Sequence, residues 1–424
     1  MRIKTVISIA SVSAVLLLGW GPGVSAESSL TDSQALGKSL FFDENLSLNN
    51  NQSCATCHDP AAGWVGATED INAHGSVYEG SIPGAFGDRK PPSAAYATQS
   101  PILHVDRKGT FVGGNFWDGR ATGEKLGNPA ADQAQGPFLN PKEQALPDSA
   151  CVVYRACRAD YADLIGEVWG GAACGVDWPE GADATCAAGT GLREALPAGD
   201  QILVDVAYDQ LALSIADYEG SPEVNAFDSK YDLSLAGQAK LTKQERLGFA
   251  LFQGKGQCKL CHVSSGKNPL FTDYTFDNLG IPKNPENPAT IAESTWADPG
   301  LGGFLETRDD YAGYAADNLG KHKVPTLRNV ALGSDDFVKA YGHNGYFKSL
   351  EGIVHFYNTR DVLPVCEGDL ADATEAEALA ANCWPAPEVA ANVNTAELGD
   401  LGLTPAEEAA IVAFLKTLSD GDTP

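Results

Sequence analysis

The sequence has almost no methionine and little positive charge. Met1 is the only methionine in 424 residues, so a mature chain that has lost Met1 offers no thioether ligand to a metal. Lysine and arginine number 29 against 56 aspartates and glutamates, which gives a formal net charge of −27. Such a chain repels nucleic acid and anionic lipid and attracts cationic partners. A nucleic-acid-binding function is therefore excluded.

Long apolar runs are also missing after the first 26 residues. At the N-terminus, Arg2 and Lys4 precede an apolar run over residues 6–20, and a small-x-small sequence ends at Ala26. This layout is typical of a cleavable signal peptide, and the run is too short for a transmembrane helix. We expect residues 1–26 to be removed, leaving a protein without a membrane span in the periplasm or at the cell surface. An uncleaved membrane anchor is the alternative.

Two copies of the motif Cys-x-x-Cys-His give the clearest chemical signal. They occupy residues 54–58 and 258–262, and their cysteines and histidines are Cys54, Cys57, His58, Cys258, Cys261 and His262. Two thiols at this spacing attach to one haem, and the adjacent histidine ligates its iron. A zinc half-site would need a second ligand pair, and a redox dithiol needs no histidine. We therefore predict two covalently bound haem c groups with His58 and His262 as axial ligands.

The other six cysteines are predicted to form disulfides, because export places the chain in an oxidising compartment. Their connectivity does not follow from sequence alone. Pairing of near neighbours is the simplest expectation, which gives Cys151–Cys157, Cys174–Cys186 and Cys366–Cys383.

The haem motifs lie in an internal repeat. The pattern Leu-Gly-x-x-Leu-Phe precedes each motif, at residues 36–41 and 247–252, behind a Thr with Gln or Glu three residues later, as at a helix start. Further helices are expected over residues 202–219 and 404–418, with long Gly/Pro-rich loops at 75–115 and 263–320. The pattern predicts a mainly α protein with two helical haem domains, residues 27–232 and 233–424.

The motifs belong to a longer pattern that resembles the bacterial di-haem cytochrome c peroxidase / MauG family. The matching stretches, spread over nearly the whole mature chain, are residues 36–42, 116–121, 133–137, 271–273, 323–330 and 343–345. The resemblance implies two cytochrome c-like domains whose haems face the inter-domain interface. It also implies that one haem meets peroxide and the other receives or relays electrons.

The resemblance assigns roles around the first haem motif. It makes the haem at His58 the peroxide site, with Glu143 as the acid–base group and Gln133 and Pro137 in the distal pocket. Trp117 matches a tryptophan between the haems. Without the resemblance, Glu143 would be interpreted as a solvated loop charge and Trp117 as a core residue.

The second haem's distal ligand separates branches of the family. Tyr357 lies fourteen residues after His343, where cytochrome c peroxidases have methionine and MauG has tyrosine. The resemblance therefore implies Tyr357 as an iron ligand opposite His262. Helical spacing places Tyr357 on one face with Leu350, Ile353 and Val354. A hard oxygen ligand lowers the haem potential. The alternative is that Tyr357 does not bind iron and only packs in the core.

Other positions bear on the branch and on cofactors. His74 lies where many of these peroxidases keep a removable distal ligand and MauG keeps none; an exposed loop histidine is the equal alternative. Lys90 stands at the position of the family's calcium-ligating asparagine, and an ammonium repels Ca²⁺, which puts calcium in doubt.

Gly256 replaces a surface tryptophan that MauG uses to oxidise its protein substrate. The Cys-bearing insertion 146–200 has no assigned role, and a lid or a docking surface are both compatible with it.

The sequence thus predicts an exported di-haem c-type peroxidase that reduces hydrogen peroxide at the N-terminal haem. Electrons would come through the C-terminal haem from a small cytochrome c or cupredoxin. The first alternative is a MauG-like oxidase that modifies tryptophan or tyrosine residues of a partner protein. The second is a di-haem electron carrier, which leaves Gln133 and Glu143 without a purpose. Monomer and homodimer are both compatible with the sequence.

Overall fold

A computed structural model describes residues 30–421 of the protein. The predicted signal peptide, residues 1–26, lies outside the described residues. Helices dominate, and the regular strands are two short antiparallel pairs: β1 (His104–Val105) with β2 (Phe111–Val112), and β3 (Phe276–Asp277) with β4 (His322–Lys323). The mainly α class is therefore confirmed. Across residues 30–421, no helix combines the length and apolar character that crossing a membrane requires.

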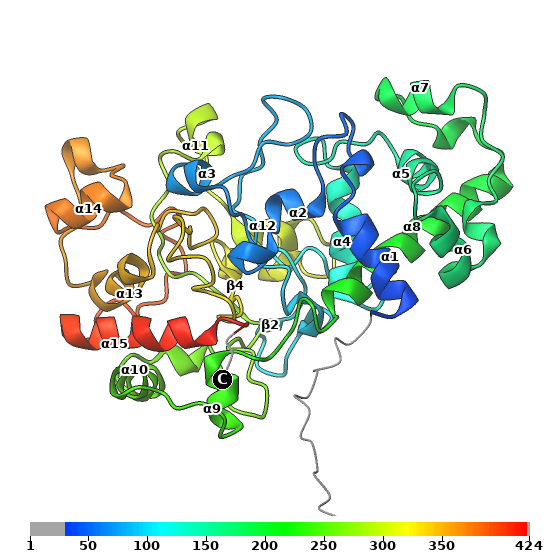
Figure 1. Cartoon of the computed structure of the whole chain (residues 1–424). Coiled ribbons are helices and arrows are strands. Elements are labelled where there is room, and N and C mark those ends of the chain that lie inside the picture. The colour runs from blue at the N-terminus through cyan, green and yellow to red at the C-terminus, as the bar shows by residue number, and fades with distance from the viewer. Residues whose placement is uncertain (1–29, 422–424) are drawn as a thin grey trace, which may run out of the picture.

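Most of the helices form two groups (Figure 1). On one side lie the helices of the N-terminal half, α1 (Asp32–Phe41), α4 (Pro129–Leu139), α5 (Ser149–Ala156), α6 (Ala162–Trp169), α7 (Ala182–Ala187) and α8 (Ala198–Glu219). On the other lie α10 (Lys243–Gln253), α13 (Leu350–Thr359), α14 (Glu375–Ala381) and α15 (Pro405–Leu415). The remaining helices are α2 (Cys54–Cys57), α3 (Glu69–Ala73), α9 (Lys230–Leu235), α11 (Pro288–Ala292) and α12 (Gly300–Glu306).

The internal repeat produces the same helix packing twice. Helix α1 packs on α8, and α10 packs on α15. Both α1 and α10 begin with the predicted capping box, formed by Thr31 and Thr242 as N-caps. A Cβ added at Gly37 would lie 1.8 Å from the carbonyl oxygen of Ser214, and one at Gly248 would lie 1.8 Å from that of Ala410. Each glycine is therefore required for close contact between two helix backbones.

Replacing Gly248 with alanine should destabilise the fold. The new methyl group would collide with the α15 backbone, which cannot yield as a flexible side chain can. Overpacking of this kind typically costs about 1–3 kcal/mol. The matched control is Gly166→Ala, also inside a helix but with open space around the added methyl. Thermal unfolding followed by circular dichroism should show a lowered midpoint for Gly248→Ala alone; equal midpoints would contradict the packing argument.

The buried apolar side chains form two large cores. One core contains residues between Leu36 and Val224, and the other contains residues between Tyr231 and Leu418. Each core packs around the helix pair of its own repeat. This separation supports the predicted division of the chain near residue 232, which stays a prediction.

The disulfides differ in part from the expectation. Cys366–Cys383 is confirmed, but the other two predicted pairings are wrong, because the pairs are Cys151–Cys186 and Cys157–Cys174. Cys151 lies in α5 and Cys157 caps its end, so the helix directs their side chains to different faces. Each cysteine instead reaches forward to the later part of the insertion, and the two bridges are nested.

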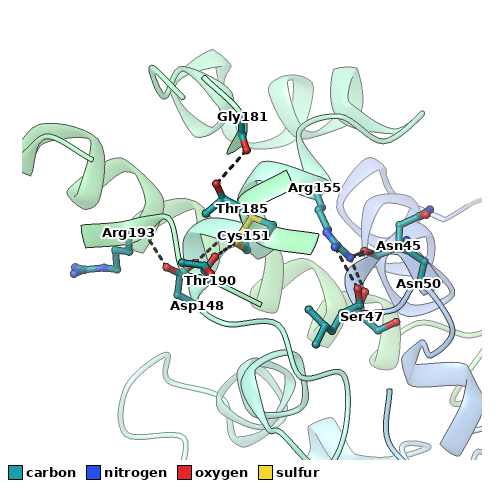
Figure 2. Close-up of a disulfide and its surroundings, with 12 residues drawn as sticks. Asn45, Ser47, Asn50, Asp148, Cys151, Arg155, Gly181, Thr185, Thr190 and Arg193 are labelled. Carbon is teal, nitrogen blue, oxygen red and sulfur yellow. Dashed lines mark hydrogen bonds between the residues drawn. A yellow bond between two sulfur atoms is a disulfide. The ribbon is translucent and has the colours of Figure 1, made fainter. Parts of the chain in front are cut away.

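The insertion is anchored to the body of the protein near the first haem motif (Figure 2). Asp148 caps α5 by accepting from the Cys151 amide at 2.9 Å, and it also accepts from the Arg193 amide at 2.8 Å. Arg155 donates to the carbonyls of Asn45 and Ser47 and to the Asn50 side chain. The insertion is therefore a stapled, docked element rather than a free loop.

Peptide mapping should recover these three bridges. Alkylation of the unreduced mature protein should label no cysteine, because six form disulfides and the four motif cysteines would be joined to haem. Intact mass should correspond to a chain that starts at Glu27 with two haems and three disulfides. A labelled thiol in the insertion, or a Cys151–Cys157 peptide, would contradict the nested arrangement.

Candidate active site: two cysteine–histidine cavities

Each haem motif opens into a cavity and holds its histidine in one orientation. The first cavity, of about 380 Å³, is lined by Cys57 and His58, and the second, of about 220 Å³, by Cys258, Cys261 and His262. In each histidine, Nδ1 donates to a backbone carbonyl, that of Trp64 at 3.2 Å for His58 and that of Phe271 at 2.8 Å for His262. The other ring nitrogen, Nε2, is thereby left for iron, an arrangement typical of metal-ligating histidines.

The protonation chemistry of the motifs also fits haem attachment. The four motif cysteines are unpaired, whereas the other six form disulfides. Burial raises the pKa of Cys54 to about 12, so these thiols are not activated redox cysteines. Burial lowers the pKa of His58 to about 4, which keeps the ring neutral, as an iron ligand requires. The donor set therefore fits a covalently bound haem at each motif.

Polar residues from α4 and the loop after it line the first cavity. Gln133 lies in α4, and the Glu143 side chain reaches the cavity from four residues beyond the end of α4. Asn140 caps α4 and donates from Nδ2 to Glu143 Oε2 at 2.9 Å, which fixes the carboxylate. Burial raises the pKa of Glu143. Pro137 does not line the cavity; it lies half-buried inside α4.

A second carboxyl group in this cavity was missed from the sequence. Glu219 is the last residue of α8 and is 3% exposed. It lines the first cavity, and burial raises its pKa to about 8. A helix end after a regular apolar pattern resembles an ordinary solvated terminus, so no sequence signal marked this residue. Glu219 is a neutral acid near pH 7.

The second cavity contains Tyr357. The four residues predicted to share a helix face, Leu350, Ile353, Val354 and Tyr357, all line this cavity with His262. His355 does not line it and instead contacts Glu408, at 3.0 Å from Nδ1. Burial raises the pKa of Tyr357. The phenol therefore faces the same space as the predicted proximal histidine.

The two cavities share one wall. Trp117 and Lys90 line both, as does the stretch from Lys323 to Thr326. The buried Trp117 indole donates from Nε1 to the Lys90 carbonyl at 2.7 Å. Lys90 is buried, and its Nζ donates to the Pro91 carbonyl at 2.9 Å. An ammonium in this place does not fit a calcium site, since Ca²⁺ requires oxygen ligands.

His74 is the one predicted iron ligand that the structure does not bring to a cavity. It follows α3, its side chain is 60% exposed, and its Nδ1 donates to the Asp70 carbonyl at 2.8 Å. Neither cavity includes it among its lining residues. Among residues 30–421, His58 is therefore the one histidine that lines the first cavity.

Comparison with known proteins decides the family. The sequence profile of the di-haem cytochrome c peroxidase family matches residues 31–240. The methylamine utilization protein MauG of Paracoccus denitrificans is 35% identical over 399 residues, covering 91% of this chain and 88% of MauG. The chain belongs to the di-haem cytochrome c peroxidase / MauG family. It is therefore an oxidoreductase of the di-haem peroxidase class.

Other members of the family match over similar lengths. The cytochrome-c peroxidase IdrP2 of Denitromonas iodatirespirans is 25% identical over 435 residues, covering 99% of this chain and 91% of that protein. The crystal structure of the di-haem peroxidase BthA from Burkholderia thailandensis superposes with a TM-score of 0.70 at 27% identity, covering 92% of this chain and 86% of BthA. Family membership implies two haems, a peroxide substrate, and a redox partner or protein substrate.

Proposed function

We propose that this di-haem peroxidase reduces hydrogen peroxide in the cavity of His58. A haem held by Cys54, Cys57 and His58 would supply the iron at which the O–O bond is cleaved. The observation that supports this proposal is that a buried carboxyl, Glu143, lines the same cavity as His58. The overall reaction takes two electrons and two protons per peroxide and yields two water molecules.

Glu143 acts as the proton carrier in this proposal. Cleavage of the O–O bond is easiest when one group takes the proton from the near oxygen and delivers it to the far one. Its raised pKa brings the carboxyl closer to the operating pH, and the hydrogen bond from Asn140 holds it in place. Gln133 supplies a further amide at the same wall of the cavity.

Trp117 connects the two cavities. Its indole ring lines both, and the hydrogen bond to Lys90 fixes its orientation. An aromatic ring at a shared wall shortens each electron-transfer step between the haems. Electrons would therefore travel from the His262 cavity through Trp117 to the His58 cavity.

We propose that the electrons come from tryptophan or tyrosine side chains of a partner protein. Tyr357 supports this choice, because it lines the cavity of His262, and a phenolate that ligated the iron there would lower the potential of that haem and stabilise its oxidised states. The position of His74 supports it too, since among residues 30–421 no second histidine lines the first cavity. The 35% identity with MauG points the same way.

A small redox donor is the second candidate. Gly256 favours it, because this chain has no tryptophan at the place where MauG passes charge to its protein substrate. A cytochrome c or cupredoxin would then supply both electrons. In either case, the signal peptide predicted at residues 1–26 would place the reaction in the periplasm or at the cell surface.

One experiment separates the two candidates. The diferric protein and the reduced protein are each mixed with one equivalent of peroxide, and the spectra of both haems are followed. A rapid, long-lived change at both haems of the diferric protein is the expected result. Reaction only after reduction would favour the small donor, and no reaction of either form would contradict the peroxidase itself.

A further inference from the structure

A buried cluster of titratable side chains lies in the wall of the second cavity, apart from the residues used so far. His322 in β4 and His343 both line this cavity. Their rings are stacked, with centroids 3.6 Å apart and planes 11° from parallel. Their side chains are 10% and 6% exposed. Two stacked imidazoles in a buried wall need a specific charge environment, because a proton on one repels a proton on the other.

A carboxylate lies at each end of the pair. Asp298 Oδ2 lies 3.2 Å from His322 Nε2, and Glu388 Oε2 lies 2.8 Å from His343 Nε2. Glu388 also accepts from the Asn344 amide at 3.0 Å. His322 Nε2 is buried and makes no hydrogen bond with any of the described residues. This nitrogen is the unsatisfied position of the cluster.

The surrounding charges favour one added proton. Arg89 donates to both oxygens of Asp298, at 2.6 and 2.7 Å, and is the cation hydrogen-bonded within the cluster. Lys90, Lys323 and Lys339 also line the cavity, and burial lowers the pKa of each, which reduces the positive charge that they carry. With neutral imidazoles, Asp298, Glu388 and Arg89 sum to one negative charge. Asp118 lies behind Arg89 and is balanced by Arg120. One proton on the imidazole pair would therefore neutralise the cluster.

A metal ion fits this geometry less well than a proton. The lone pair of each imidazole nitrogen lies in the plane of its ring, so two parallel rings cannot both direct Nε2 at one ion. The Asp298 oxygen nearest His322 already accepts from Arg89, whose positive charge would repel a cation. The observations favour a proton site.

We propose that the His322–His343 pair takes up one proton when one electron enters the adjacent cavity of His262, and releases it when that electron leaves. The electron comes from the donor of the proposed function, and the proton comes from solvent. An added negative charge in a low-dielectric cavity raises the proton affinity of neighbouring groups. The inference rests on the haem at His262 that the proposed function requires.

The protonation of His322 before the electron enters agrees with this proton uptake and release. Burial lowers the pKa of His322, and the adjacent His343 lowers it further. His322 is therefore neutral near pH 7 until the electron arrives. Proton uptake then keeps the charge of the wall and cavity constant, so that an electron can enter a buried site of an acidic protein.

The test is the pH dependence of the midpoint potential of the second haem. Potentials of the holoprotein are measured by spectroelectrochemistry from about pH 5 to pH 8, where histidine charge changes. Coupled uptake of one proton per electron lowers the potential by about 59 mV for each unit rise in pH. His322→Phe should flatten this slope, because phenylalanine keeps the stack but carries no titratable nitrogen, and Asp298 stays paired with Arg89.

Two further variants make the result specific. Glu388→Gln removes a negative charge beside His343 and should move the sloping region to lower pH. His355→Phe disrupts a histidine–carboxylate contact that does not line the cavity and should leave the slope unchanged. Haem content and thermal unfolding establish that each variant is folded.

Three outcomes would overturn the inference. A wild-type slope in His322→Phe would overturn it while leaving the proposed function intact. A stoichiometric zinc or copper ion in the purified protein, lost in His322→Phe, would replace the proton site with a metal site. Absence of any second reduction wave would overturn the inference together with the proposed function.

Discussion

Glu143→Gln should retain both haems and the fold, but its rate of peroxide turnover should fall by about 10²–10⁴-fold, the usual contribution of general acid–base catalysis. Glutamine has the shape of glutamate and can still meet Asn140, so the cavity should be preserved. An amide cannot take a proton from one peroxide oxygen and return it to the other. The measurement is steady-state peroxide consumption with a small artificial donor, with haem spectra to verify the site.

The informative control is Glu219→Gln. Glu219 is the other carboxyl that lines this cavity, but its pKa of about 8 leaves it protonated near pH 7, when it cannot act as a base. We expect Glu219→Gln to keep most of its turnover. Equal losses in both variants would remove the specific role of Glu143, and loss in Glu219→Gln alone would transfer the role to Glu219.

The pH profile provides an independent check on Glu143. Burial raises its pKa, and the carboxyl must be ionised to accept the first proton. As pH falls through that raised pKa, kcat/KM of the wild type should decline, and it should recover as pH rises. Glu143→Gln should lack this acid limb. An identical limb in both proteins would assign it to another group.

Local chemistry was readable from the sequence. The haem motifs, the capping boxes at Thr31 and Thr242, and the face of the helix that bears Tyr357 depend on residues close together in the chain. Such patterns follow from helix geometry and motif spacing alone. They predicted two haems and the mainly α class, and the helical structure confirms the class.

Contacts between segments that lie far apart in the chain could not be predicted from the sequence. The nested disulfides depend on how α5 is oriented relative to the later part of the insertion. Glu219 reaches the first cavity because α8 packs against α1, and His322 stacks on His343 because β4 meets the loop before α13 at the second cavity. Each contact is set by tertiary packing that no local pattern encodes.

Tyr357→Phe should change the electronic spectrum of the second haem. If the phenolic oxygen binds iron opposite His262, phenylalanine removes one axial ligand and leaves that haem five-coordinate or open to water. Oxidation of a partner protein should then be lost, because the phenolate no longer stabilises the oxidised haem. Peroxide consumption in the His58 cavity should persist at least in part, since Glu143 and Gln133 are untouched.

Tyr341→Phe is the matched control for this experiment. Tyr341 lines the same cavity, is buried, and its hydroxyl has no hydrogen-bond partner among residues 30–421. Removing that hydroxyl should leave the spectrum of the second haem unchanged. Tyr357→His offers a further comparison, because imidazole should keep six-coordination yet donate less charge to an oxidised iron. A Tyr357→Phe spectrum identical to wild type would show that Tyr357 only packs, and the electrons would then more simply come from a small redox donor.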